Sequence, residues 1–242
     1  MPALKADIIT QLKKDILALQ GFRPLVDARY KIDLGTINHA FPNSTFPLGV
    51  NHEFICNHAE DLTASSGFIT GILSTLLQKG GAVAWISSSH VIFPPALVSF
   101  GIEPSQVIFI RLHHQKEILW ATEEALKCEG LTGVVGELSS IDLTVSRRLQ
   151  LASEQSRVTG FLLRYPPKQL NTTACVCRWQ IHSLKSETAD GLPGVGFPRW
   201  AIELLKVRNG KPGRWQLEWA NGKFNEVMVK TTSTTEEQKQ AV

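Results

Sequence analysis

The sequence has no apolar stretch long enough to cross a membrane, and charged residues interrupt its first 19 positions. These absences argue against a membrane span, a membrane anchor and a secretion signal. The chain also has only four cysteines, and none of them form the Cys-x-x-Cys pairs of zinc ribbons. This shortage argues against a zinc ribbon or a disulfide framework, so we expect a soluble protein in a reducing cytoplasm.

The chain has enough apolar residues for a buried core. Its 242 residues are 43% hydrophobic and 19% charged, which is too little charge for a disordered chain. The charge is uneven: residues 140–242 carry 15 Lys and Arg against 9 Asp and Glu, whereas residues 1–139 carry 10 against 13. A basic half of this kind fits nucleic-acid contact, and it fits an ordinary solvated surface equally well.

The amino-terminal residues have the spacing of an amphipathic helix. Ile8, Leu12 and Ile16 recur every four residues and form one apolar stripe. We therefore divide the chain into an amino-terminal helix at residues 1–24, which contacts a partner or a second copy, a core domain at residues 25–229 and a polar tail at residues 230–242.

The core alternates short apolar runs with helical stretches. Such alternation predicts right-handed strand-helix-strand crossovers and a mainly parallel sheet with helices on both faces. The expected strands are residues 53–56, 82–87, 107–112, 133–138 and 158–163, and the expected helices are residues 67–78, 95–100, 116–128 and 143–157.

After residue 165 the apolar residues follow a period of two. Residues 174–181 and 215–219 alternate in this way, and residues 209–213 have the composition of a hairpin turn. The carboxy-terminal end of the sheet is therefore expected to be antiparallel. The predicted fold class is an α/β protein with a mainly parallel sheet, helices on its faces and antiparallel strands at the carboxy-terminal end.

In a sheet of this kind the first strand-to-helix turn is the natural phosphate site. Residues 57–67 of this chain read NHAEDLTASSG. Phe68 and Ile69 stand where a phosphate-binding loop needs Lys and Ser or Thr, and the carboxylates of Glu60 and Asp61 would repel a triphosphate. The part of this segment that still resembles the end of a phosphate-binding loop is Ser65, Ser66 and Gly67.

Several longer stretches resemble the RecA ATPase core and, more closely, the RecA-like ImuA family. The resemblance covers roughly residues 1 to 220 and is carried by FPPAL, LWATEEALKCEGL, SRRLQLASEQSRVTGFLLR, LNTTACVCRWQI and GVGFPRWAIELLKVRNGKPG. It implies a RecA-like fold of the P-loop NTPase type. It also implies a role in SOS-induced, error-prone translesion synthesis with an ImuB-type Y-family-like protein and a specialised replicative-type polymerase.

The chain departs from RecA at the positions that matter for ATP hydrolysis. Ser89 falls where RecA has the glutamate that activates water, and serine cannot act as that base. Glu137 falls where a magnesium-binding aspartate would be, at the end of a strand. Residues 139–142 leave almost no room for the first DNA-binding loop of RecA. We therefore expect a protein without catalytic residues, metal or cofactor.

Seven basic residues remain as candidates for a DNA or subunit contact. In RecA the corresponding carboxy-terminal hairpin carries two lysines that reach the ATP of a neighbouring subunit, so the resemblance implies a subunit contact there. A DNA-backbone contact and a solvated edge fit the same charges. The candidates are Arg147, Arg148, Arg178, Lys206, Arg208, Lys211 and Arg214.

These observations favour a non-catalytic RecA-fold accessory protein that binds partner proteins and DNA, in single-stranded or damaged form. Two alternatives stay open. The first is a DNA-dependent ATPase or recombinase with an atypical phosphate loop, and the missing lysine counts against it. The second is a cell-division inhibitor of the SulA type, and the length of the chain counts against it.

Overall fold

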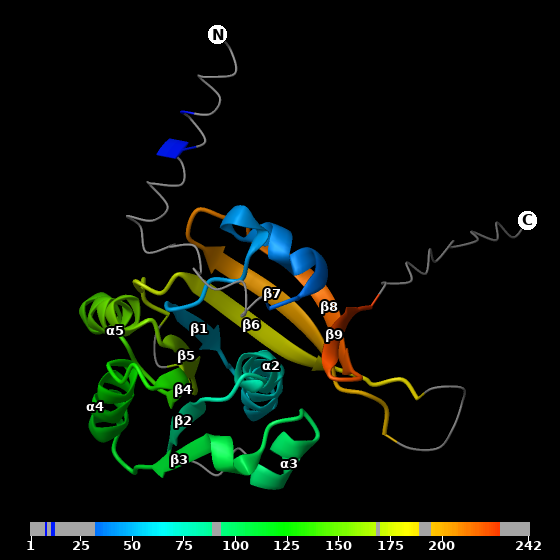
Figure 1. The fold of residues 1–242 in the computed structure, drawn as a ribbon, viewed down its shortest axis with the longest axis horizontal. Coiled ribbons are helices and arrows are strands. Elements are labelled where there is room, and N and C mark those ends of the chain that lie inside the picture. Colours follow the sequence, from blue (N-terminus) through cyan, green and yellow to red (C-terminus); the bar gives the residue numbers. More distant parts are fainter. Residues whose placement is uncertain are drawn as a thin grey trace, which may run out of the picture.

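Figure 1 shows the computed structural model of the chain, which describes residues 8, 11, 12, 32–88, 93–167, 170–188 and 195–227. Among these residues, nine strands form one sheet in the order β3-β2-β4-β5-β1-β6-β7-β8-β9. Strands β1 to β6 are parallel, and β7, β8 and β9 are antiparallel to their neighbours. The strands are β1 (Asn51–Ile55), β2 (Ala82–Ser87), β3 (Val107–Arg111), β4 (Leu131–Glu137), β5 (Thr159–Arg164), β6 (Cys177–Leu184), β7 (Arg199–Val207), β8 (Gly213–Ala220) and β9 (Lys223–Glu226).

Helices cover both faces of the sheet (Figure 1). The larger core lies between the sheet and α2 and gathers the aromatic side chains, whereas the smaller core lies under α4 and α5. The helices are α2 (Ala59–Leu77), α3 (Pro94–Val98), α4 (Gln115–Leu126) and α5 (Leu143–Ser156), with 3-10 turns η2 (Gly35–Ala40), η3 (Pro42–Ser44) and η4 (Pro104–Gln106). None of the described helices has the length and apolar composition that a membrane crossing requires.

This mixed sheet confirms the predicted fold class, and all five predicted parallel strands overlap strands of the structure. The short connection after β4 is also present, because only residues 138–142 separate Glu137 from the first residue of α5. The predicted start of the first core helix at residue 67 is wrong. Helix α2 begins at Ala59, because His58 and Asp61 form a capping box that satisfies its first backbone N–H groups.

The antiparallel strands are part of the same core as α2. Strand β9 places Phe224 against the middle of α2, and a Cβ atom on Gly71 would come within 2.6 Å of the Phe224 ring. The Phe224 ring also lies 4.8 Å from that of Trp219 and 5.3 Å from that of Phe68. A glycine is therefore required in α2 for the carboxy-terminal strands to pack this closely.

Candidate functional site

A crevice of about 670 Å³ lies beside the first three turns of α2, between the carboxyl end of β6, the start of β7 and α3. Ligands of open α/β sheets bind at this edge. The floor of the crevice is one stripe of α2 from Ala59 to Thr70. Its walls come from α3 and its flanks, including Phe93 and Phe100, and from the start of β7, including Trp200. Most of this lining is apolar.

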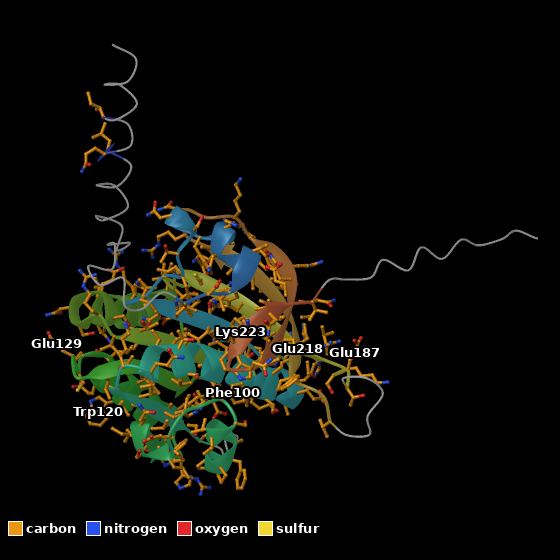
Figure 2. The ribbon with its side chains drawn as sticks, turned by 45° about the vertical axis from the view of Figure 1, so that its right-hand side comes forward. Phe100, Trp120, Glu129, Glu187, Glu218 and Lys223 are labelled. Carbon is orange, nitrogen blue, oxygen red and sulfur yellow. The ribbon has the colours of Figure 1, made fainter. Side chains whose placement is uncertain are left out.

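The charged side chains among the described lining residues are Glu60 and Arg199. Arg199 is already paired, because its guanidinium contacts the carboxylates of Glu218 and Glu187. Figure 2 labels both of these glutamates, together with Phe100 of the opposite wall. The crevice therefore presents an exposed carboxylate and a neutralised arginine, which is a poor environment for a triphosphate.

At the amino terminus of α2 a carboxylate of the protein binds the backbone N–H groups that precede the helix. The Asp61 Oδ2 atom accepts hydrogen bonds from the backbone N–H of Asn57, at 3.1 Å, and of His58, at 3.2 Å. The other Asp61 oxygen lies 2.7 Å from Nδ1 of His182 on β6. Backbone N–H groups at this place hold phosphate in nucleotide-binding proteins. Here they are bound to an internal anion that is only 4% exposed.

The three residues that resemble a phosphate-binding loop, Ser65, Ser66 and Gly67, lie inside α2. The Ser65 hydroxyl accepts a hydrogen bond from the Cys56 thiol, and the Ser66 hydroxyl is buried without a partner among the described residues. Gly67 faces the crevice, and a Cβ atom on it would approach the Trp200 ring to 3.2 Å. These residues lie two turns into the helix, so their backbone N–H groups are not the exposed donors of a loop.

Residue 68, where the sequence analysis expected the lysine of a phosphate-binding loop, is buried. Phe68 is fully covered and its ring lies 5.9 Å from that of Trp179 and 6.1 Å from that of Trp200. The neighbouring Ile69 is equally buried in the same core. A lysine at residue 68 would place an ammonium group in an apolar core and not in the crevice.

Glu137 ends β4 and is buried, with 4% of its surface exposed. The pKa of the nearby Cys56 thiol is raised to about 12, mainly by burial; the hydrogen bond with Ser65 opposes this rise, and the carboxylates of Asp61 and Glu137 add to it. The described residues contain no group of three His, Cys, Asp or Glu side chains with the arrangement of a metal site. Ser89, the position of the water-activating glutamate, lies outside the described residues.

A buried ionic network lies on the opposite face of β1. Both oxygens of Glu53 are used: Oε1 accepts from Arg164 at 2.6 Å, and Oε2 accepts from Arg178 and from the Thr173 hydroxyl, each at 2.8 Å. Glu53 and Arg164 are fully buried. Sequence reasoning missed this network, although its signal was present as charged residues within or next to apolar strand runs.

Three of the seven candidate cations lie together, and they bind the loop before β6. Arg178 donates to the carbonyl oxygen of Asn171 at 2.7 Å, Lys206 to that of Thr173 at 2.8 Å, and Arg208 to that of Ala174 at 2.9 Å. Burial lowers the pKa of Lys206. The strand pairing of β6 with β7 brings these cations together, and they clamp residues 171–174.

The other four candidate cations lie in two pairs, one on α5 and one on the hairpin between β7 and β8. On α5, Arg148 pairs with Glu123 at 2.7 Å, and on the hairpin Arg214 pairs with Glu203 at the same distance. The side chains of Arg147 and Lys211 have no partner among the described residues. Ile8 and Leu12 are half-exposed, whereas Ile16, the rest of residues 1–24 and the tail at 230–242 lie outside the described residues.

Comparison with known proteins identifies relatives of this chain. No protein-family model matches the chain. The protein ImuA of Caulobacter vibrioides, from strain NA1000 / CB15N and equally from strain ATCC 19089 / CIP 103742 / CB 15, is 35% identical over 195 residues, which are 76% of this chain and 80% of that protein.

The fold has a counterpart among solved structures. The crystal structure of the RadB recombinase matches 76% of this chain and 93% of its own, with a TM-score of 0.51 and 14% identity. This likeness confirms the RecA-like fold and carries no further conclusion. The identity and coverage of the two curated relatives show that the chain belongs to the ImuA family.

Proposed function

We propose that this chain is a non-catalytic accessory protein of DNA damage tolerance. It supports error-prone translesion synthesis during the SOS response by binding an ImuB-type Y-family-like protein, which acts with a specialised replicative-type polymerase. Family membership supports the damage-tolerance role. The partners, the SOS induction, the cytoplasmic location with association to the nucleoid, and a weak contact with single-stranded or damaged DNA belong to the proposal.

The carboxylate of Asp61 carries the non-catalytic part of the proposal. It occupies the backbone donors that a phosphate would need, and it is held there by two backbone N–H groups and by His182. A phosphate would have to displace a buried, fully hydrogen-bonded anion of the same sign. No lysine that would compensate the charge is among the described residues that line the crevice.

A nucleotide assay tests this part. The purified chain is incubated with ATP, with and without single-stranded DNA, and phosphate release is compared with that of an active RecA-fold ATPase. We expect no release above background and no binding of a fluorescent ATP analogue. DNA-stimulated phosphate release that disappears in Glu137→Gln would contradict the proposal and support the ATPase alternative.

An affinity capture from DNA-damaged cells tests the partner part. The tagged chain is expected to retain a Y-family-like protein, whereas a tagged unrelated protein of similar charge is not. Retention of a cell-division protein in place of a polymerase homologue would support the alternative of a division inhibitor. The two assays are independent, because a chain that binds no ATP can still fail to bind a polymerase.

A further inference from the structure

We propose that the crevice beside α2 binds an extended peptide segment of a partner protein, and that this segment has two large apolar side chains and a lysine or arginine at one end. The inference rests on the proposed function for the identity of the partner. For the chemistry of the segment it rests on the crevice itself, so the two can be tested separately.

The first sign of a ligand is a buried hydroxyl group without a partner. Ser66 is 4% exposed, and its hydroxyl has no hydrogen-bond partner among the described residues. The same residue lines the crevice, on the stripe of α2 that runs from Ala59 to Thr70. A buried polar group without a partner costs free energy, so a ligand that supplies a hydrogen bond at this place is favoured. A peptide backbone supplies both a carbonyl acceptor and an N–H donor.

The floor of the crevice suits an extended main chain. Its lining positions on α2 are mostly small side chains, with Thr63 and Thr70 about one turn on either side of Ser66. From Ala59 to Thr70 the floor is about 16 Å long at 1.5 Å per residue, which is the length of about five residues of an extended segment. A helix uses its backbone groups internally, so only an extended segment can bind the Ser66 hydroxyl through its main chain.

The walls of the crevice hold apolar side chains that the single chain leaves exposed. Phe93, at the start of α3, is 70% exposed, and Val195, before β7, is 97% exposed. Exposed apolar groups of this size in a groove with a polar border are typical of a site that binds another protein segment. Successive side chains of an extended segment point to opposite sides. One apolar side chain of the segment therefore meets the wall at α3, and the next meets the wall at β7.

The border of the crevice is acidic. Glu60 is an exposed carboxylate at the end where α2 begins, and it has no ion pair among the described residues. At the start of β7 the single guanidinium of Arg199 is shared by the carboxylates of Glu187 and Glu218, which Figure 2 labels. These three carboxylates outnumber the one arginine that lines the crevice. A lysine or arginine of the segment is therefore favoured at the end beside Glu60.

The same features disfavour other occupants. A nucleotide would bring its phosphates to an acidic border. A wholly apolar ligand would leave the Ser66 hydroxyl and the Glu60 carboxylate without a partner. A segment with a free main chain, two apolar side chains and one basic side chain has a group for each part of the crevice.

The experiment selects peptides from a phage-displayed library of random heptapeptides on the immobilised full chain. Enriched peptides are synthesised with a fluorescent label, and their affinities are measured by fluorescence anisotropy at several salt concentrations. We expect the enriched sequences to share two large apolar residues with a lysine or arginine on one side of them. Selection that enriches no peptide would overturn the proposal.

Three substitutions test the three features of the crevice. Phe93→Asp should weaken binding of the selected peptides by about tenfold or more, and α3 should be kept because aspartate is a usual helix N-cap. Ser66→Ala should weaken binding by roughly fivefold and leave thermal stability unchanged or raised, because it removes an unpaired buried hydroxyl. Glu60→Lys should weaken binding of the basic peptides and reduce its dependence on salt. Circular dichroism establishes that every variant is folded.

Two matched controls lie on the opposite face of the sheet. Leu151→Asp on α5 places the same charge on an apolar side chain that is 57% exposed. Glu117→Lys on α4 reverses an exposed carboxylate that, like Glu60, lies in the first turn of its helix. Both should bind the selected peptides as the wild type does. Peptides that bind Phe93→Asp and Glu60→Lys as tightly as these controls would overturn the proposal.

Two further measurements separate this inference from the proposed function. A fluorescent ATP analogue that binds the wild type and not Phe93→Asp would overturn the inference, because the crevice would then hold a nucleotide. The affinity capture is repeated with Phe93→Asp, and we expect the Y-family-like protein to be retained by the wild type and lost by the variant. Equal retention by both would overturn the crevice as the site of that partner. If the wild type retains no such protein while the selected peptides still bind the crevice, the proposed function fails and the peptide site stands.

Discussion

The two faces of strand β1 are built in opposite ways. Toward α2 the strand presents His52 and Phe54 to an aromatic core, where the Phe46 and His52 rings stack at 4.5 Å. Toward α5 it presents Asn51, which binds Ser153, and Glu53, which binds the buried Arg164 and the partly buried Arg178. One face is stabilised by apolar packing and the other by paired charges and hydrogen bonds.

On both faces the charged side chains are bound to other groups of the protein. On the apolar face the phosphate position is filled by Asp61, and on the polar face the cations bind Glu53 or loop carbonyls. The charges on both faces therefore serve to hold the fold together. The crevice beside α2 is a mainly apolar surface that the fold leaves open for a ligand.

The largest expected effect on stability comes from a substitution in the buried ionic network on the polar face of β1. Arg164→Met leaves the Glu53 carboxylate buried with one fewer cation, so we expect a loss of roughly 3 to 5 kcal/mol in the free energy of unfolding, measured with urea. Arg214→Met removes an exposed pair with Glu203 and is the control, with an expected cost below about 1 kcal/mol. Equal costs for the two variants would show that the polar face is not held by its buried charges.

The next effect concerns pH on the aromatic face. Burial lowers the pKa of His52 to about 4, against a hydrogen bond to the carbonyl of Pro47 that raises it. The unfolded chain binds this proton near pH 6.5 and the folded chain only near pH 4, so the contribution is present above pH 6.5 and is lost as pH falls toward 4. The full difference is roughly 3 kcal/mol.

The measurement is the stability of wild type minus that of His52→Gln across this pH range. We expect the difference to shrink by roughly that amount on acidification, because the variant lacks the titrating group. A parallel pair of profiles for wild type and His52→Gln would mean that His52 does not titrate differently on folding.

A smaller effect on stability is expected from removal of the Asp61 carboxylate beside the crevice. Asp61→Ala removes the carboxylate from two backbone N–H groups and from His182, and should cost about 1 to 2 kcal/mol in thermal or urea unfolding. Glu60→Ala, one residue earlier and exposed, should cost less than about 0.5 kcal/mol. ATP binding should stay absent in both variants, since neither substitution adds a cation beside these N–H groups. Nucleotide binding gained by Asp61→Ala would contradict that interpretation.

The smallest effect concerns the surface cations. Arg147→Ala combined with Lys211→Ala should weaken single-stranded DNA binding equally for all sequences and reduce the slope of log affinity against log salt by about one per contact. Arg208→Ala should instead loosen the loop at residues 171–174 and lower stability. If the double variant binds DNA as the wild type does, these two residues are part of a solvated edge.

The sequence predicted most of the sheet because strands such as β2 are apolar runs between turn residues, although β1 carries Asn51, His52 and Glu53 among its five residues. It did not predict the start of α2, since His58 is not a usual helix cap and the apolar period begins only later. The Glu53 network joins residues 111 and 125 positions apart. The crevice walls at Phe93 and Trp200 are equally distant in sequence, so local patterns cannot bring them together.

The carboxylate at the start of α2 also has a consequence for control. On the proposed function, a chain whose Asp61 carboxylate binds these backbone donors stays in one state whatever the ratio of ATP to ADP. Its binding to a partner then follows the concentrations of the two proteins. For such a chain we expect the rates of synthesis and degradation to set the timing of its action. Its activity would then follow its concentration and not a change of state driven by nucleotide.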